Sequence, residues 1–322
     1  MIRHVLQYSV SDEGGVLTNI IWSVQMPGFM LVSGYFSSRI IVKMKDVTVR
    51  ISLSLQHYAI PFLSWFIMIN TLVLGQYSRN PISGLRELFS HIDIGLWFLW
   101  VIFILSIIAT FANYALSCNK NRIIKFIVVI MISFGLLLAA AKVFGLNFIG
   151  IKYILYYSVF YGFGWMVKRT ERWWKRFWPL ISNIVIGLCF FVFIAIIFNY
   201  DLYNAKDNLI GISMRCISGF TGNVVLLMIC QKYKSILSRA KIDTIGMYTL
   251  EIYATHMYVN NLMEMQGSFF TLSGFGVFVS SLVLTTVFTA IIIVTIKTIP
   301  LTDFVFFGKN KNEKALRKEI MK

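Results

Sequence analysis

The sequence predicts an all-α fold: a polytopic bundle of about nine transmembrane helices with a cytoplasmic C-terminus. Of the 322 residues, 57% are hydrophobic and only 14% are charged, whereas soluble domains carry about 25% charged residues. Apolar runs of about 20 residues, the length that crosses the hydrocarbon core, recur along the chain. Positive charges gather in alternate loops between these runs. A soluble fold would have to expose large apolar patches, so that class is excluded.

Nine apolar segments are candidates for membrane-spanning helices. They lie at residues 20–36, 51–74, 94–113, 123–141, 149–167, 177–198, 209–230, 244–262 and 268–297. The first, fifth and eighth segments are short or mixed in polarity. The eighth carries Glu251 and His256. Because ionisable side chains within a membrane face protein or water, this helix is expected to lie away from lipid.

The lysines and arginines are sorted between the loops. One set of alternate loops, with the C-terminal tail, holds 23 of them, and the other set holds 6, with Arg215 left inside a span. This positive-inside pattern places the C-terminus in the cytoplasm and, with nine spans, the N-terminus outside. The net charge of +16 therefore reflects topology, and no nucleic-acid partner is expected. We expect one membrane domain over residues 1–303 and a basic cytoplasmic tail over residues 304–322.

Few side chains have the character needed for catalysis. Judged by their surroundings alone, His4 is a terminal residue without a role, His57 anchors a helix end at the membrane interface, and His91 is solvated. Glu251 and His256 lie in an apolar helix, where an ionisable pair is either functional or structural. The sequence contains no HExxH or CxxC spacing, so no metal site is expected.

Five segments, read in order, carry a family resemblance. They are QMPGFMLVSGYF at 25–36, LWFLW at 96–100, YILYYSVFYGFG at 153–164, IGMYTLEIYATH at 245–256 and PLTDFVFFGK at 300–309. These segments resemble motifs of the membrane acyltransferase 3 family, especially its branch of sugar O-acetylases of the fucose 4-O-acetylase type. Within the motifs, the residues expected to shape the structure or line the site are Pro27, Ser33, Gly34, Tyr35 and Trp97.

The resemblance implies an acyltransferase of the cell membrane, namely the inner membrane of a bacterium, that binds no resident cofactor. The family usually transfers acetyl from cytoplasmic acetyl-CoA, or another acyl-CoA, to a hydroxyl of a cell-envelope saccharide or exopolysaccharide, in some cases lipid-linked. His4, in the run His-Val-Leu-Gln, matches the end of the family's Gly-His-x-x-Gln-like motif. The resemblance therefore implies that His4 is catalytic, either as a general base or as the site of a covalent acyl-imidazole.

The remaining expected site residues follow from charge and position. The residues expected to contact the phosphates of acyl-CoA are Arg39, Lys43, Lys45, Arg50 and His57. On the acceptor side we expect Glu251 and His256.

Two features of the sequence depart from the family pattern. The family normally has ten spans, and the span that ends in the histidine motif is not found before His4, so we expect the visible spans to be the last nine of ten. Gln25 stands where a histidine is common, and Gln56 and His57 stand before Pro61 where paired arginines are common. Two alternatives to an active enzyme therefore stay open: a transporter or flippase of a lipid-linked saccharide, and an inactive relative that serves as a partner subunit.

Overall fold

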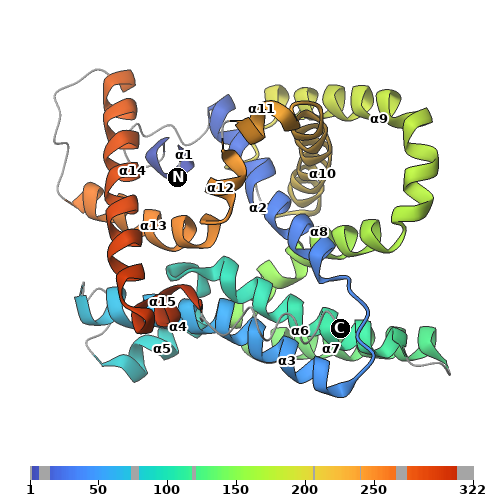
Figure 1. The fold of residues 1–322 in the computed structure, drawn as a ribbon, viewed down its shortest axis with the longest axis horizontal. Coiled ribbons are helices and arrows are strands. Elements are labelled where there is room, and N and C mark those ends of the chain that lie inside the picture. Colours follow the sequence, from blue (N-terminus) through green and yellow to red (C-terminus); the bar gives the residue numbers. More distant parts are fainter. Residues whose placement is uncertain are drawn as a thin grey trace. The chain divides into compact units, whose positions relative to one another are not determined.

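The computed structural model describes residues 2–6, 15–73, 80–117, 121–205, 207–239, 241–265 and 274–309. Within these ranges the regular structure is helical and no strand occurs (Figure 1). The predicted all-α class is therefore confirmed. The chain forms two compact units: unit 1 comprises Met1–Phe29 and Glu171–Thr295, and unit 2 comprises Met30–Thr170 and Ile296–Lys322.

Six helices in the described part of the chain are long and apolar enough to cross a membrane. They are α2 (Val16–Ser37), α6 (Trp97–Ser117), α7 (Arg122–Phe144), α9 (Glu171–Asn199, through its part Ile181–Asn199), α10 (Leu209–Lys232) and α14 (Gly274–Thr298, through its part Gly276–Thr298). The polytopic helical membrane fold is therefore confirmed, whereas the total of nine spans and the side of the C-terminus stay predictions.

The other three predicted spans also fall on helices. The span at 51–74 falls on a continuous helical run made of α3 (Met44–Ser54), η2 (Leu55–Ala59), α4 (Ile60–Trp65) and η3 (Phe66–Val73). The span at 149–167 corresponds to α8 (Ile151–Arg169), and the span at 244–262 to α12 (Ile242–Gly246) and α13 (Thr249–Met265). Two of these three, the fifth and eighth, are segments that the sequence shows to be short or mixed in polarity.

Helix α7 presents its apolar side chains outward. None of its residues is buried, and Met131 and Leu136 are among its strongly exposed side chains. In water such a surface would drive association, whereas in a bilayer it matches the lipid chains. The helix therefore has the character of a lipid-facing span.

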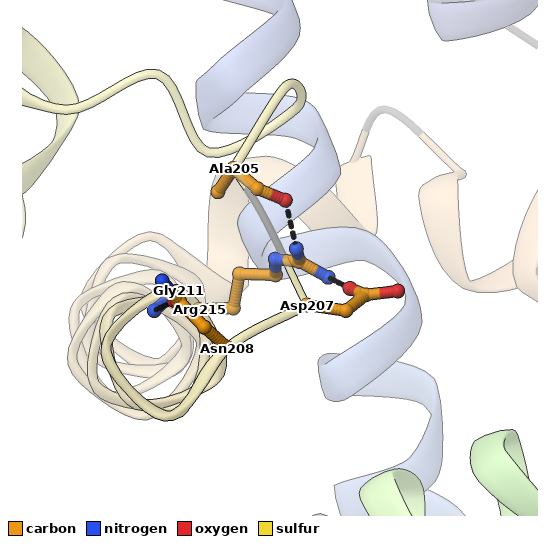
Figure 2. Close-up of polar contacts among 5 residues, drawn as sticks. All are labelled: Ala205, Asp207, Asn208, Gly211 and Arg215. Atoms are coloured by element: carbon orange, nitrogen blue, oxygen red, sulfur yellow. Dashed lines mark hydrogen bonds and ion pairs between the residues drawn. The ribbon is translucent and has the colours of Figure 1, made fainter.

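Arg215, a charge inside the predicted span 209–230, reaches back to the loop that precedes α10 (Figure 2). Its Nη1 lies 2.8 Å from the carboxylate of Asp207, and its Nη2 donates a hydrogen bond to the carbonyl oxygen of Ala205. The guanidinium also lies over the ring of Trp22 on α2, 5.5 Å from the ring centroid. These contacts compensate a charge that would be costly in an apolar span.

Two glycines of the family motifs bring α2 and α8 into backbone contact within unit 2. A Cβ atom on Gly34 would lie 1.9 Å from the carbonyl oxygen of Tyr161, and one on Gly164 would lie 1.9 Å from that of Leu31. Only glycine fits at such distances. The motifs at 25–36 and 153–164 therefore form the two sides of one helix crossing.

The last family motif forms a short helix, α15 (Pro300–Phe307), beside α4 in unit 2 (Figure 1). The indole Nε1 of Trp65 donates to the carbonyl oxygen of Phe306 at 2.9 Å, and the amide of Gln56 donates to that of Gly308 at 2.8 Å. Residues 304–307, which begin the predicted basic tail, thus belong to a packed helix. The part of that tail from residue 310 onward lies outside the described residues.

Candidate functional site

His4 lies against His256 in unit 1. Helix α1 (Ile2–Val5) lies beside α13 (Figure 1), and the two imidazole centroids are 5.3 Å apart with their planes tilted by 51°. His4 is half-buried, and the side chain of His256 is only 3% exposed. From the sequence, His4 is expected to be catalytic and His256 to lie on the acceptor side. The structure brings the two together.

A backbone contact defines the tautomer of His256. Its Nδ1 lies 2.6 Å from the carbonyl oxygen of Ile252. A carbonyl oxygen only accepts hydrogen bonds, so Nδ1 carries the hydrogen, and Nε2 of the neutral ring keeps a lone pair. This Nε2 atom is buried and has no hydrogen-bond partner among the residues that the structure describes. His256 therefore offers an acceptor to an incoming donor.

The interior of unit 1 around His256 is polar. The buried polar side chains on α13 and α14 are Glu251, Thr255, His256, Asn260, Ser281, Thr285 and Thr289. Thr255 donates to the carbonyl oxygen of Glu251 at 2.8 Å, and Thr285 donates to Oδ1 of Asn260 at 2.9 Å. Polar groups gathered inside apolar helices are typical of a substrate or proton site.

The buried hydroxyls of α14 follow a regular spacing in the sequence. Ser281, Thr285 and Thr289 recur at every fourth position of an apolar helix. This spacing places them on one helix face. A polar stripe on one face of an apolar span indicates that this face lies against protein.

A cavity of about 320 Å³, lined by both polar and apolar side chains, lies within unit 2. It is lined by Val32, Ser33, Phe36, Ser37, Arg50, Leu53, Ser54, His57, Tyr58, Ile102, Ser106, Thr110 and Tyr161. Three of these residues, Ser33, Arg50 and His57, are among the expected site residues. The volume is at the lower end of the range for small-molecule sites, about 300–1,000 Å³. A ligand as large as CoA would therefore place only part of itself here.

Arg50 is the cation of this cavity. Its Nη1 donates to the backbone carbonyl of Arg39 at 3.3 Å. Arg50 precedes the predicted span 51–74, and burial, followed by the positive charge of Arg39, lowers the pKa of its guanidinium. Since arginine titrates far above neutral pH, the group stays charged and attracts an anion. Arg39, Lys43 and Lys45 are exposed and are not among the residues that line the cavity.

His57 lies on η2, a π-helical turn in the run that begins with α3. Turns of this kind are rare and frequently occur at functional sites. Gly308, with φ of +66°, packs directly on this turn: a Cβ atom there would lie 2.2 Å from the carbonyl oxygen of Gln56 and 2.8 Å from Cα of His57. The C-terminal motif therefore supports the turn that presents His57 to the cavity.

Replacing Gly308 with alanine is expected to impair the cavity. The left-handed backbone disfavours a side chain by about 1–2 kcal/mol, and the new methyl group would press on the backbone at Gln56 and His57. We expect a lower midpoint of thermal unfolding in detergent. Gly135→Ala is the matched control, since its Cβ would meet no atom within 4 Å. Equal behaviour of the two variants would contradict the supporting role.

Asn113 is a functional-site neighbour that the sequence analysis missed. It is fully buried, and its Oδ1 accepts hydrogen bonds from Trp165 Nε1 at 3.0 Å and from Arg169 Nη2 at 2.6 Å. Its Nδ2 donates to the carbonyl oxygen of Ser37, a cavity residue, at 2.8 Å. An amide within an apolar run is the signal that could have drawn attention to it.

The remaining motif residues make structural contacts. Trp97 stacks on Tyr153 and Tyr157, with centroid distances of 4.8 and 5.4 Å. The hydroxyl of Tyr35 accepts a hydrogen bond from Lys168 at 3.2 Å. Pro27 lies inside α2.

Metal ligands are not gathered in the described part of the chain, where no group of three or more His, Cys, Asp or Glu side chains could hold an ion. The expectation that the protein needs no metal stays a prediction.

The apolar helices and the buried polar side chains define the class of the protein: a polytopic membrane protein whose unit 1 holds ionisable and amide groups in its interior. The model of the acyltransferase 3 family, described as an acyltransferase domain, matches residues 1–294. The chain belongs to this family, and it is a membrane acyltransferase. No curated protein and no solved structure matches this chain significantly. The family resemblance is thus confirmed, and the sugar O-acetylase branch stays a prediction.

Proposed function

We propose that the chain transfers an acyl group, most readily acetyl, from acyl-CoA to a hydroxyl of a cell-envelope saccharide or exopolysaccharide. In this proposal it lies in the plasma membrane of a bacterium, and the acceptor is in some cases lipid-linked. Family membership supports the acyl transfer. The observation that carries the assignment of the site is the contact between His4 and His256, 5.3 Å apart in a buried polar part of unit 1.

His4 acts as the general base in this proposal. A sugar hydroxyl is a weak nucleophile, and a positioned histidine that removes its proton contributes about 10²–10⁴-fold to the rate. The hydroxyl oxygen bonds to the thioester carbon while His4 takes the proton. The carbon–sulfur bond then breaks, and the thiolate of CoA takes the proton back from His4. The products are an ester and free CoA thiol.

The alternative route is a covalent one, in which an imidazole nitrogen of His4 first takes the acyl group and then passes it to the hydroxyl. Rapid quenching with labelled acetyl-CoA in the absence of acceptor distinguishes the two routes. Label on a peptide containing His4 indicates the covalent route, and unlabelled protein indicates direct transfer.

The cavity of unit 2 is the candidate site for part of the donor. Arg50 supplies a charge, and the hydroxyls of Ser33 and Ser54 line the cavity beside it. The hydroxyls of Ser106 and Thr110 donate to backbone carbonyl oxygens, so toward a ligand they can act as acceptors. Hydrogen bonds to a charged group contribute about 1.5–3 kcal/mol. This arrangement suits a phosphate or the polar amides of the pantetheine arm.

Arg50→Gln is expected to raise the KM for acyl-CoA about 10- to 100-fold, since 1.4 kcal/mol corresponds to a factor of ten. The kcat should change little, because in this proposal the guanidinium binds the donor and takes no part in the bond changes at the thioester. Lys125→Gln removes an exposed positive charge from α7 and serves as the matched control. Initial rates over a range of acyl-CoA concentrations measure the effect, and identical KM values for the two variants would contradict a donor role for Arg50.

Labelled acetyl-, succinyl- and longer acyl-CoA donors, supplied to membranes that contain the chain, test the proposed function directly. We expect label from acetyl-CoA to appear in an alkali-labile ester on envelope saccharide. Incorporation from another donor alone would correct the acyl group, and the absence of any labelled ester would reject the proposal.

A further inference from the structure

His256 and Asn260 form a buried polar pair on one face of α13. They are four residues apart, so their Cβ atoms lie about 6 Å from each other. Each side chain is only 3% exposed. Neither residue type is readily buried in an apolar helix without a partner for its polar atoms.

Thr285 of α14 orients the amide of Asn260. The hydroxyl of Thr285, itself fully buried, donates to Oδ1 of Asn260 at 2.9 Å. The Nδ2 group of Asn260 therefore presents its hydrogens on the other side of the amide. That buried Nδ2 has no hydrogen-bond partner among the residues that the structure describes. A buried donor left unsatisfied costs about 1–3 kcal/mol, which indicates that a ligand accepts from it.

The two open atoms are complementary to a group that both donates and accepts a hydrogen bond. Nε2 of His256 can only accept, because Nδ1 carries the hydrogen that faces Ile252, and Nδ2 of Asn260 can only donate. An alcohol hydroxyl donates one hydrogen bond and accepts others, so it satisfies both atoms. An ammonium group has no lone pair with which to accept, and a carboxylate has no hydrogen to donate.

We propose that His256 and Asn260 bind a hydroxyl of the acceptor adjacent to the hydroxyl that reacts at His4. The inference rests on the proposed function and identifies its acceptor as a vicinal diol, the arrangement found around a sugar ring. His256 touches His4, so a hydroxyl held by His256 places its neighbour near the base. Thr285 is a positioning residue, which acts by holding the amide of Asn260.

Equilibrium binding tests this subsite without turnover. The probes are methyl galactoside and its monodeoxy analogues, titrated into the purified full chain in detergent by calorimetry. We expect the wild type to bind methyl galactoside about tenfold more tightly than the analogue that lacks the bound hydroxyl, the effect of one hydrogen bond of about 1.4 kcal/mol. Thr285→Val and Asn260→Asp should reduce this preference, because they displace or remove the donor Nδ2 while Nε2 of His256 can still accept from the hydroxyl.

Thr286→Val is the matched control, since Thr286 is the exposed neighbour of Thr285 on the same helix. It should keep the wild-type preference, and the unfolding midpoint of each variant reports whether it is folded. The proposal is overturned if the wild type does not discriminate between the probes, or if Thr285→Val discriminates as well as Thr286→Val. Release of CoA thiol, measured separately, reports on the acyl transfer itself, so failure of the proposed function and failure of the subsite are distinguishable.

Discussion

His4→Ala is expected to lower acyl transfer by about 10²–10⁴-fold while the amount of protein in the membrane stays normal. The loss follows from the general-base role, since the reacting hydroxyl would attack the thioester without His4 to take its proton. Truncation of a half-buried side chain at the end of the described α1 should leave the helices of unit 1 folded. The measurement is the initial rate of labelled acetyl incorporation into saccharide, with protein quantified by immunoblot.

His91→Ala is the control for this prediction. His91 is exposed and follows α5 (Pro81–Ser90) in unit 2, so its loss should leave the rate unchanged. Full activity of His4→Ala would contradict the assignment of His4 as the catalytic residue, whatever the control shows. Equal loss in both variants would instead indicate a general sensitivity to histidine replacement.

Gly34→Ala is expected to destabilise unit 2 by about 3 kcal/mol, the upper end of the usual cost of overpacking. Its Cβ atom would lie 1.9 Å from the carbonyl oxygen of Tyr161, and that oxygen belongs to helix backbone that cannot move aside alone. Gly164→Ala should have a similar effect, because its Cβ would approach the carbonyl oxygen of Leu31 equally closely. The measurement is the midpoint of thermal unfolding in detergent.

Gly162→Ala separates this crossing from a general effect of alanine in α8. Its Cβ would meet no atom within 4 Å, and alanine favours a helix over glycine by about 1 kcal/mol. We therefore expect an unchanged or slightly higher unfolding midpoint. A Gly34→Ala protein as stable as Gly162→Ala would show that α2 and α8 do not touch at their backbones.

Much of the fold could be predicted because an apolar run long enough to cross a membrane can be recognised directly in the sequence. Each of the nine apolar segments corresponds to a helix or a helical run. The π-helical turn at Leu55–Ala59 could not be predicted, since the sequence does not show that a distant C-terminal segment packs against Gln56 and His57. The predicted boundary between the membrane domain and the tail, at residues 303 and 304, falls inside helix α15. The sequence does not show that this helix packs against Trp65.

The candidate site was less accessible from the sequence. Glu251 and His256 could be recognised because ionisable groups are rare in apolar helices, whereas His4 depended on the family resemblance. His4 and His256 are far apart in the sequence, and the contact between them, which brings α1 against α13, cannot be predicted from local sequence patterns. A role for Asn260 could not be predicted, because its amide is oriented by Thr285, a partner that the sequence does not identify.

The central claim is that this chain moves an acyl group onto a hydroxyl, and vesicles containing the purified protein test it most directly. Labelled acetyl-CoA is supplied with saccharide, and three quantities are followed together: free CoA thiol, acetyl ester on the saccharide, and saccharide that crosses the bilayer. We expect thiol and ester to appear in equal amounts and both to disappear with His4→Ala. Saccharide that crosses the bilayer without release of CoA thiol would contradict the account and indicate a transporter.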